Sequence, residues 1–178
     1  MARYRRALDG TTYFFTLVAY RRRPILCDEP VRVALRTAFL QVRQRLPFHM
    51  DAIVLLPDHL HCIWRLPDGD TDFPTRWSQI KHHVAFSCRD SYGDFVTTNA
   101  QRRRREAPIW QRKYWEHRVR DEHDMERHVD YIHYNPVKHG LASTAAAWPY
   151  SSFNRFVANG IYPADWGGSD SAREMMLE

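Results

Sequence analysis

The sequence predicts an α+β fold whose elements follow the order strand, helix, strand, strand, helix, strand, with one further helix after them. Short runs rich in β-branched and aromatic residues alternate with Gly, Pro and Asp turns, as strands do. Longer runs repeat apolar residues every three or four positions, as helices do. This order is the ferredoxin-like βαββαβ pattern, which predicts an antiparallel sheet with helices packed on one face. The other face is expected to be free for a ligand.

Four strands are expected, at residues 11–20, 48–56, 59–66 and 109–120. The first, TTYFFTLVAY, consists almost wholly of β-branched and aromatic residues. The second and third are joined by Pro57-Asp58, a pair that favours a tight turn, so they are expected to form a hairpin. The turn residues PDGD then end the third strand.

Helices are expected at residues 31–46, 73–90 and 121–136. In the first, apolar residues at helical spacing alternate with arginines, and Pro47 stops the helix. In the third, Asp121 is the expected N-cap, and the residue before Pro136 is the expected last residue.

A single domain over residues 1–178 is expected, with a basic arm at 1–10 and an irregular tail at 148–178. No apolar run approaches the roughly 18 residues of a membrane span, so no membrane partner is expected. The three cysteines are far apart in sequence and do not form a CxxC motif, which favours a reducing compartment and a cytoplasmic protein.

The charge pattern is compatible with nucleic-acid binding. The net charge is +5, 13% of the residues are aromatic, and the arginines are clustered. Arginine binds phosphates bidentately and aromatic rings stack on exposed bases, although clustered arginines can equally form a solvated surface. The residues proposed to contact DNA are Arg3, Tyr4, Arg5, Arg6, Arg21, Arg22, Arg23, Arg102 and Arg103.

Two histidines stand one residue apart in LPDHLHCIW, residues 56–64. Because side chains alternate along a strand, His59 and His61 are expected on one face and Leu60 on the other. Two neighbouring imidazoles on a rigid strand can hold a metal ion. A bare HxH is also compatible with two histidines on a solvated sheet face.

The third expected helix places polar groups beside its apolar face. Met125, Val129 and Ile132 define that face, and Tyr134 is expected to point to solvent. The residues on the flank of the apolar face are His128, Tyr131 and Asn135.

Together these residues favour cleavage of a phosphodiester. Tyrosine, with a free pKa of about 10, is a poor nucleophile unless its target is activated. A cation on His59 and His61 would withdraw charge from a phosphate, and the amide oxygen of Asn135 could be a third ligand. With open positions for substrate and water, this ligand set suits Mg²⁺ or Mn²⁺ in use, and zinc or copper could bind it more tightly in vitro. The product would be a covalent bond between Tyr131 and a DNA phosphate.

At these motifs the sequence resembles a known family. LPDHLHCIW, WQRKYWEH and HVDYIHYNPVKHGL closely resemble the REP-associated tyrosine transposases, which are single-tyrosine members of the HUH endonuclease superfamily. The resemblance implies that His59 and His61 bind the metal, that Asn135 completes the metal site, and that Tyr131 is the nucleophile. It assigns no such role to Tyr114 or Tyr134.

The resemblance also implies a substrate: single-stranded DNA at repetitive extragenic palindromes, recognised as an imperfect hairpin with a guide tetranucleotide on its 5′ side. The basic start and the tail would read that DNA, and the protein would act as a monomer. The main alternative is a non-catalytic protein that binds DNA or RNA hairpins. A zinc hydrolase fits less well, because a third histidine or carboxylate ligand is lacking.

Overall fold

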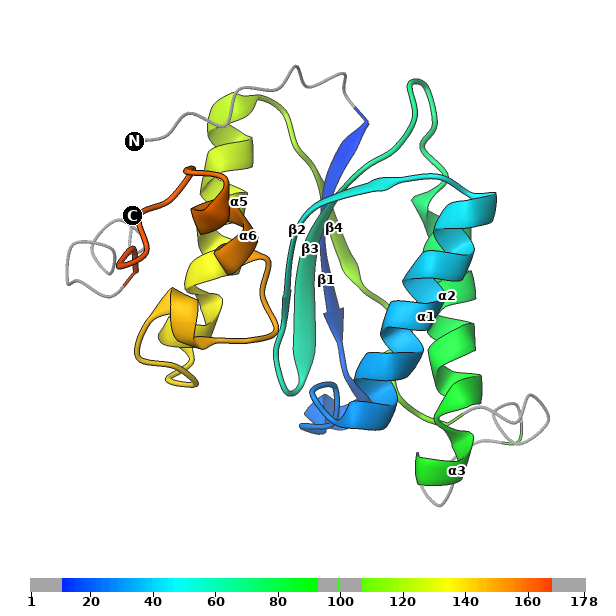
Figure 1. Ribbon diagram of the computed structural model, residues 1–178. Helices are drawn as coiled ribbons and strands as arrows, with labels where there is room; N and C mark the ends of the chain where they lie inside the picture. Colours follow the sequence, from blue (N-terminus) through cyan, green and yellow to red (C-terminus); the bar gives the residue numbers. More distant parts are fainter. Residues whose placement is uncertain (1–10, 93–98, 100–106, 168–178) are drawn as a thin grey trace.

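The computed structural model of the chain describes residues 11–92, 99 and 107–167, and it shows a sheet with helices on both faces (Figure 1). All strand pairs are antiparallel, and the strand order is β2-β3-β1-β4. The α+β class and the antiparallel sheet are therefore confirmed. The strands are β1 (Thr12–Val18), β2 (His49–Leu55), β3 (His59–Arg65) and β4 (Trp115–Arg118). The helices are α1 (Glu29–Arg45), α2 (Phe73–Ser87), α3 (Arg89–Tyr92), α5 (Glu122–Lys138) and α6 (Phe153–Ala158), with short 3-10 turns at Tyr20–Arg22 and Ala145–Ala147.

The expectation of one free sheet face is wrong. Helices α1 and α2 cover one face, and α5 and α6 lie against the other (Figure 1). That second face carries buried apolar residues of the strands, such as Phe14, Val54 and Ile63, and they pack against Met125 and Val129 of α5. Both the sheet face and the helix stripe are apolar, so each buries the other. In the described part of the chain, neither face of the sheet is therefore free of helices.

Several element boundaries also differ from the expected ones. The fourth strand is expected over twelve residues, but only Trp115–Arg118 pair with β1. Its expected first residue, Ile109, is buried, and its carbonyl accepts a hydrogen bond from the Tyr20 amide. The tail, expected to be irregular, contains α6.

Helix α5 begins as expected but ends later. The backbone N–H of Asp124 donates to the Asp121 carboxylate at 2.8 Å, so Asp121 is the N-cap. Pro136 was expected to end the helix, yet α5 continues to Lys138. In the last turn of a helix, proline removes only one backbone hydrogen bond, and a core-facing helix can tolerate that loss.

Tyr134 is not directed to solvent as expected. Its side chain is only 4% exposed, because the segment after α5 folds back over this side of the helix. Trp166 lies with its ring centre 6.4 Å from that of Tyr134, and a Cβ on Gly167 would approach the same ring to 3.6 Å.

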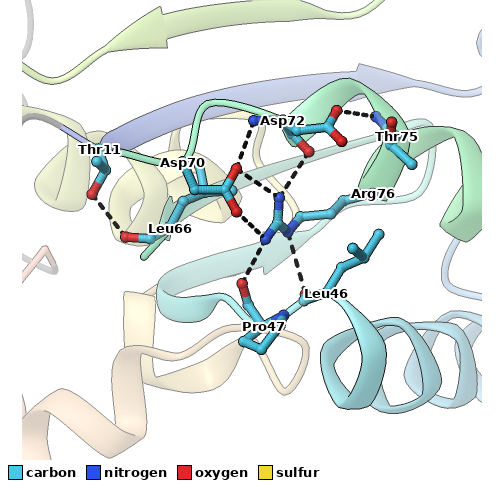
Figure 2. A network of polar contacts seen from close by, with 8 residues as sticks. All are labelled: Thr11, Leu46, Pro47, Leu66, Asp70, Asp72, Thr75 and Arg76. Atoms are coloured by element: carbon cyan, nitrogen blue, oxygen red, sulfur yellow. Dashed lines mark hydrogen bonds and ion pairs between the residues drawn. The ribbon is translucent and has the colours of Figure 1, made fainter. Parts of the chain in front are cut away.

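A buried arginine joins the two helices on the first face (Figure 2). Arg76 of α2 is 1% exposed and forms a bidentate pair with Asp70, at 2.6 and 3.2 Å. It also donates to the carbonyls of Leu46 and Pro47, just after α1, and to that of Asp72. One side chain thus fixes the start of α2 against the end of α1.

None of the described helices combines the length and the apolar character that crossing a bilayer would require.

A buried histidine makes stability depend on pH. His133 of α5 is fully buried, and its Nε2 is 2.9 Å from Ser152 Oγ, which also accepts from the Ile53 amide. Burial, together with the Arg155 guanidinium, lowers the pKa of His133 to about 3. The unfolded chain therefore binds a proton near pH 6.5 that the folded chain does not, and stability falls as the pH drops from 6.5 towards 3.

We expect this one histidine to lower the free energy of unfolding by about 2 kcal/mol between pH 7 and pH 5. Urea unfolding of His133→Leu should show a pH dependence that is weaker by this amount. The control is His123→Gln, since His123 is exposed at the start of the same helix. Equal pH dependence in the His133 variant and the wild type would contradict the prediction.

Candidate active site

The two histidines of the HxH motif lie where strand alternation places them. His59 and His61 project from the start of β3 towards the α5 side, with ring centres 4.9 Å apart, and both are buried. Leu60 and Cys62 point the other way, into the core beneath α1 and α2. The strand therefore presents two adjacent imidazoles on one face.

Each imidazole is oriented by a partner at Nδ1. Thr16 Oγ1 of β1 is hydrogen-bonded to His61 Nδ1 at 2.8 Å, and Asp58 Oδ1 lies 2.6 Å from His59 Nδ1. With Nδ1 occupied, Nε2 of each ring is the nitrogen left to bind a ligand. Partners of this kind fix the tautomer and the ring orientation of metal-binding histidines.

His61 has the protonation state that a metal ligand needs. Burial, together with the positive charges of His59 and His139, lowers the pKa of His61 to about 3, so its ring is neutral at pH 7. Its Nε2 is buried and has no hydrogen-bond partner among the described residues. Such an atom requires an explanation, and an ion, a ligand or a water molecule bound at this position would provide one.

Tyr131 lies beside this pair. Its ring centre is 5.1 Å from that of His61, and the two rings meet edge to face. The helix places it there because Val129 and Ile132 of α5 pack on the sheet and leave Tyr131 half-buried at the flank of that contact.

Asn135 follows Tyr131 by one helical turn. It is fully buried, and neither its Oδ1 nor its Nδ2 has a hydrogen-bond partner in the described part of the chain. An unpaired buried amide costs about 1–3 kcal/mol, so a ligand for it is the simplest account. His61 Nε2 and Asn135 Oδ1 thus have no partner among the described residues, and together with His59 they supply donor atoms that suit a divalent cation.

Two further residues, Lys138 at the end of α5 and the C-cap His139, border the site, and sequence reasoning assigned them no role. The Lys138 ammonium lies 5.0 Å from the centre of the Tyr131 ring, and the His139 ring centre is 5.2 Å from that of His59. Both follow Pro136, where the sequence predicts that the helix has ended. Lys138 follows Tyr131 by seven positions, the two-turn spacing that places two residues on one face of a helix.

A second cluster of possible metal ligands was also missed. His117 of β4 with Asp124 and His128 of α5 offers ligand atoms within 4.8 Å of one another. Asp124 Oδ2, however, lies 2.8 Å from His117 Nε2 and 3.2 Å from the Arg120 guanidinium, and the backbone carbonyl of Asp124 lies 2.7 Å from His128 Nδ1. Asp124 Oδ2, His117 Nε2 and His128 Nδ1 therefore already have partners, and the Arg120 guanidinium places a positive charge beside Asp124. We interpret the cluster as a structural link between β4 and α5.

The arginines proposed for DNA contact are only partly described. Arg3, Tyr4, Arg5, Arg6, Arg102 and Arg103 lie outside the described residues. Arg21, Arg22 and Arg23 follow β1 in a tight turn. Arg22 Nη1 lies 3.1 Å from Asp58 Oδ2, on the carboxylate that holds His59, and its side chain is 66% exposed. An exposed cation, paired with Asp58, therefore borders the histidine pair.

This combination of fold and site is matched by proteins of known class. Residues 7–135 match the family model described as "Transposase IS200 like", which covers most of the chain, so the protein is an IS200-like transposase. A REP-associated tyrosine transposase of Escherichia coli (strain K12) is 41% identical over 169 residues, which cover 94% of this chain and 92% of the relative. The chain belongs to the REP-associated tyrosine transposases.

A solved structure agrees with this assignment. A REP-associated tyrosine transposase bound to a REP hairpin superposes with a TM-score of 0.75 at 42% identity, over 95% of this chain and 93% of that one. A Haemophilus influenzae protein (strain ATCC 51907 / DSM 11121 / KW20 / Rd) is 40% identical over 171 residues, which cover 95% of each chain.

Proposed function

We propose that this transposase is a metal-dependent endonuclease and strand-transferase that cleaves single-stranded DNA through Tyr131. The observation that carries the proposal is the contact between the Tyr131 ring and the neutral, partner-oriented His61. A nucleophile beside a pair of free imidazole nitrogens is the arrangement that attack on a metal-bound phosphate needs.

In the proposed reaction the Tyr131 oxygen attacks phosphorus and the bond from phosphorus to the 3′ oxygen breaks. The phenol loses a proton, and the departing 3′ oxygen gains one to become a 3′ hydroxyl. The DNA stays attached as a 5′-phosphotyrosine, and the reverse attack by a 3′ hydroxyl rejoins a strand. Lys138, close to the phenol, would neutralise charge on the phosphate.

His59, His61 and Asn135 would hold the cation. Bound there, Mg²⁺ or Mn²⁺ would withdraw charge from the non-bridging phosphate oxygens. The amide oxygen and the open positions suit these ions, whereas the two imidazoles would bind zinc or copper more tightly.

The proposed substrate is a REP-type hairpin with a guide tetranucleotide on its 5′ side. The relative of known structure is bound to a REP hairpin, and it covers nearly all of this chain. The basic N-terminal segment, the turn at Arg21–Arg23 and the run with Arg102 and Arg103 would contact phosphates. We propose that one chain acts as a monomer, in the cytoplasm.

The test is incubation with labelled hairpin DNA and Mg²⁺ or Mn²⁺, followed by denaturing electrophoresis. We expect an SDS-stable protein–DNA adduct that EDTA abolishes. Tight hairpin binding without an adduct under any divalent metal would instead support a non-catalytic hairpin-binding protein.

Thr16 gives a sharper test of the metal site. Thr16→Val removes the hydrogen bond to His61 Nδ1 but leaves the ligands in place. Loss of such an orienting partner typically weakens metal binding by about 10- to 100-fold. Isothermal titration with Mn²⁺ should show this loss.

Thr12→Val is the matched control, because Thr12 lies on the same face of β1 and its buried Oγ1 has no partner among the described residues. Equal Mn²⁺ affinity in the two variants would contradict the proposed role of His61.

A further inference from the structure

One exposed aromatic residue lies near the site, and the proposed chemistry does not use it. Trp115 of β4 is 54% exposed. β4 is an edge strand, and edge strands usually avoid large exposed apolar side chains because these invite association. The exposed tryptophan at this position is therefore a candidate contact for another molecule.

The sheet register aligns Trp115 with the histidine pair. Thr16 of β1 is paired with His61 of β3 on one side and with Trp115 of β4 on the other. All three therefore project from one row of the sheet towards its α5 side. Two strand spacings, about 10 Å, separate the backbones of Trp115 and His61. Helix α5 packs chiefly on β2 and reaches β4 at His117, and the Trp115 side chain at the β4 end of this row is exposed.

The Trp115 ring is backed by a fixed series of rings. It lies parallel to His117, with an angle of 2° between the planes and 5.8 Å between the centres, and edge-on to Phe14 at 5.6 Å. His117 stacks in turn on His128, with ring centres 4.8 Å apart. The buried Asp124 carboxylate holds His117 Nε2 at 2.8 Å. The indole is thus held by a rigid support and keeps an exposed surface.

The charges near this ring suit a nucleic acid. Among residues 112–120 the exposed cations are Arg112, Lys113, Arg118 and Arg120, against one exposed anion, Glu116. Arg118 alternates with Trp115 to the opposite face of β4, and Arg120 is paired with Asp124, which leaves Arg112 and Lys113, just before the strand, as the candidate phosphate contacts. Cations that track a phosphate backbone, beside an aromatic ring on which a base stacks, are the usual elements of a single-strand binding site.

We propose that Trp115, supported by His117, is a stacking platform for an unpaired base of the strand whose phosphate lies at Tyr131. The proposal rests on the proposed function, since it assumes that single-stranded DNA reaches the His61–Tyr131 pair. The row of residues from His61 through Thr16 to Trp115 would then mark the path of the unpaired nucleotides across the sheet.

The test uses Tyr131→Phe protein, which cannot form the adduct, and measures equilibrium binding of hairpin DNA with an unpaired 5′ extension. Adding Trp115→Ala should weaken binding by roughly 5- to 100-fold, whereas Trp115→Phe should retain most of the affinity. The same DNA with a single abasic site, moved along the extension, should bind the parent protein more weakly at one position. At that position, removing the base should not weaken DNA binding by the Trp115→Ala protein any further, because the ring on which the base would stack is already absent.

Phe86→Ala is the matched control, because Phe86 is 41% exposed on α2, on the other face of the sheet, and its loss should not change binding. Abasic sites that weaken the parent and the Trp115→Ala protein equally would overturn the platform. A Trp115→Ala change that alters oligomeric state but not DNA affinity would overturn it in favour of an edge-to-edge protein contact. If the protein binds the hairpin and Trp115→Ala does not change the affinity, the platform is overturned and the cleavage proposal stands. If the protein does not bind the hairpin at all, the platform and the cleavage proposal are both overturned.

Discussion

Replacing Tyr131 by phenylalanine should abolish the covalent protein–DNA adduct while leaving hairpin binding intact. The substitution removes one oxygen atom and keeps the ring that packs against His61 and Phe14. Because the phenolic oxygen is the proposed nucleophile, its removal should prevent formation of the bond to phosphorus. We expect adduct formation to fall by roughly 10³-fold or more, the scale on which loss of a nucleophile acts in covalent catalysis.

Two other tyrosines provide matched controls. Tyr114 packs near Trp77, on the face of the sheet covered by α1 and α2, and Tyr134 is buried against the segment after α5. Neither lies beside the histidine pair, so Tyr114→Phe and Tyr134→Phe should both form the adduct. An undiminished adduct with Tyr131→Phe would show that the nucleophile is wrongly assigned, and its loss with Tyr134→Phe would identify the replacement.

Local patterns predicted much of this arrangement. Alternation along a strand is strict, so the spacing of His59 and His61 was enough to place both on one face. The capping signal of Asp121 and the periodicity of α5 likewise depend on near neighbours only. The predictions of these features agree with the structure because no contact with a distant part of the chain overrides the local preference.

What the sequence could not supply depends on tertiary packing. The burial of Tyr134 comes from Trp166, more than thirty residues later, and no local period encodes that contact. The continuation of α5 through Pro136 depends on packing that offsets a lost hydrogen bond, and it is this extra turn that brings Lys138 and His139 to the site. Predicting that Thr16 is the hydrogen-bond partner of His61 would have required knowledge of the register between β1 and β3.

The largest effect on stability is expected from Arg76. Arg76→Met keeps the bulk of the side chain but leaves the carbonyls of Leu46, Pro47 and Asp72 without their donor. Asp70 is partly exposed, so water can solvate its carboxylate once the arginine is gone. The loss of folding free energy therefore falls towards the lower end of the range for breaking a buried ion pair. We expect the free energy of unfolding to drop by about 3 kcal/mol.

Arg43→Met is the comparison that isolates burial. Arg43 also donates to a carbonyl near the end of α1, that of Phe48, but its side chain is exposed, so water can replace it. Its loss should cost less than about 1 kcal/mol in urea unfolding. Arg76→Lys should recover little, because an ammonium group cannot reproduce the planar fork that binds Asp70 and two separate backbone segments at once. Equal destabilisation by Arg76→Met and Arg43→Met would show that the buried network adds nothing to an ordinary surface contact.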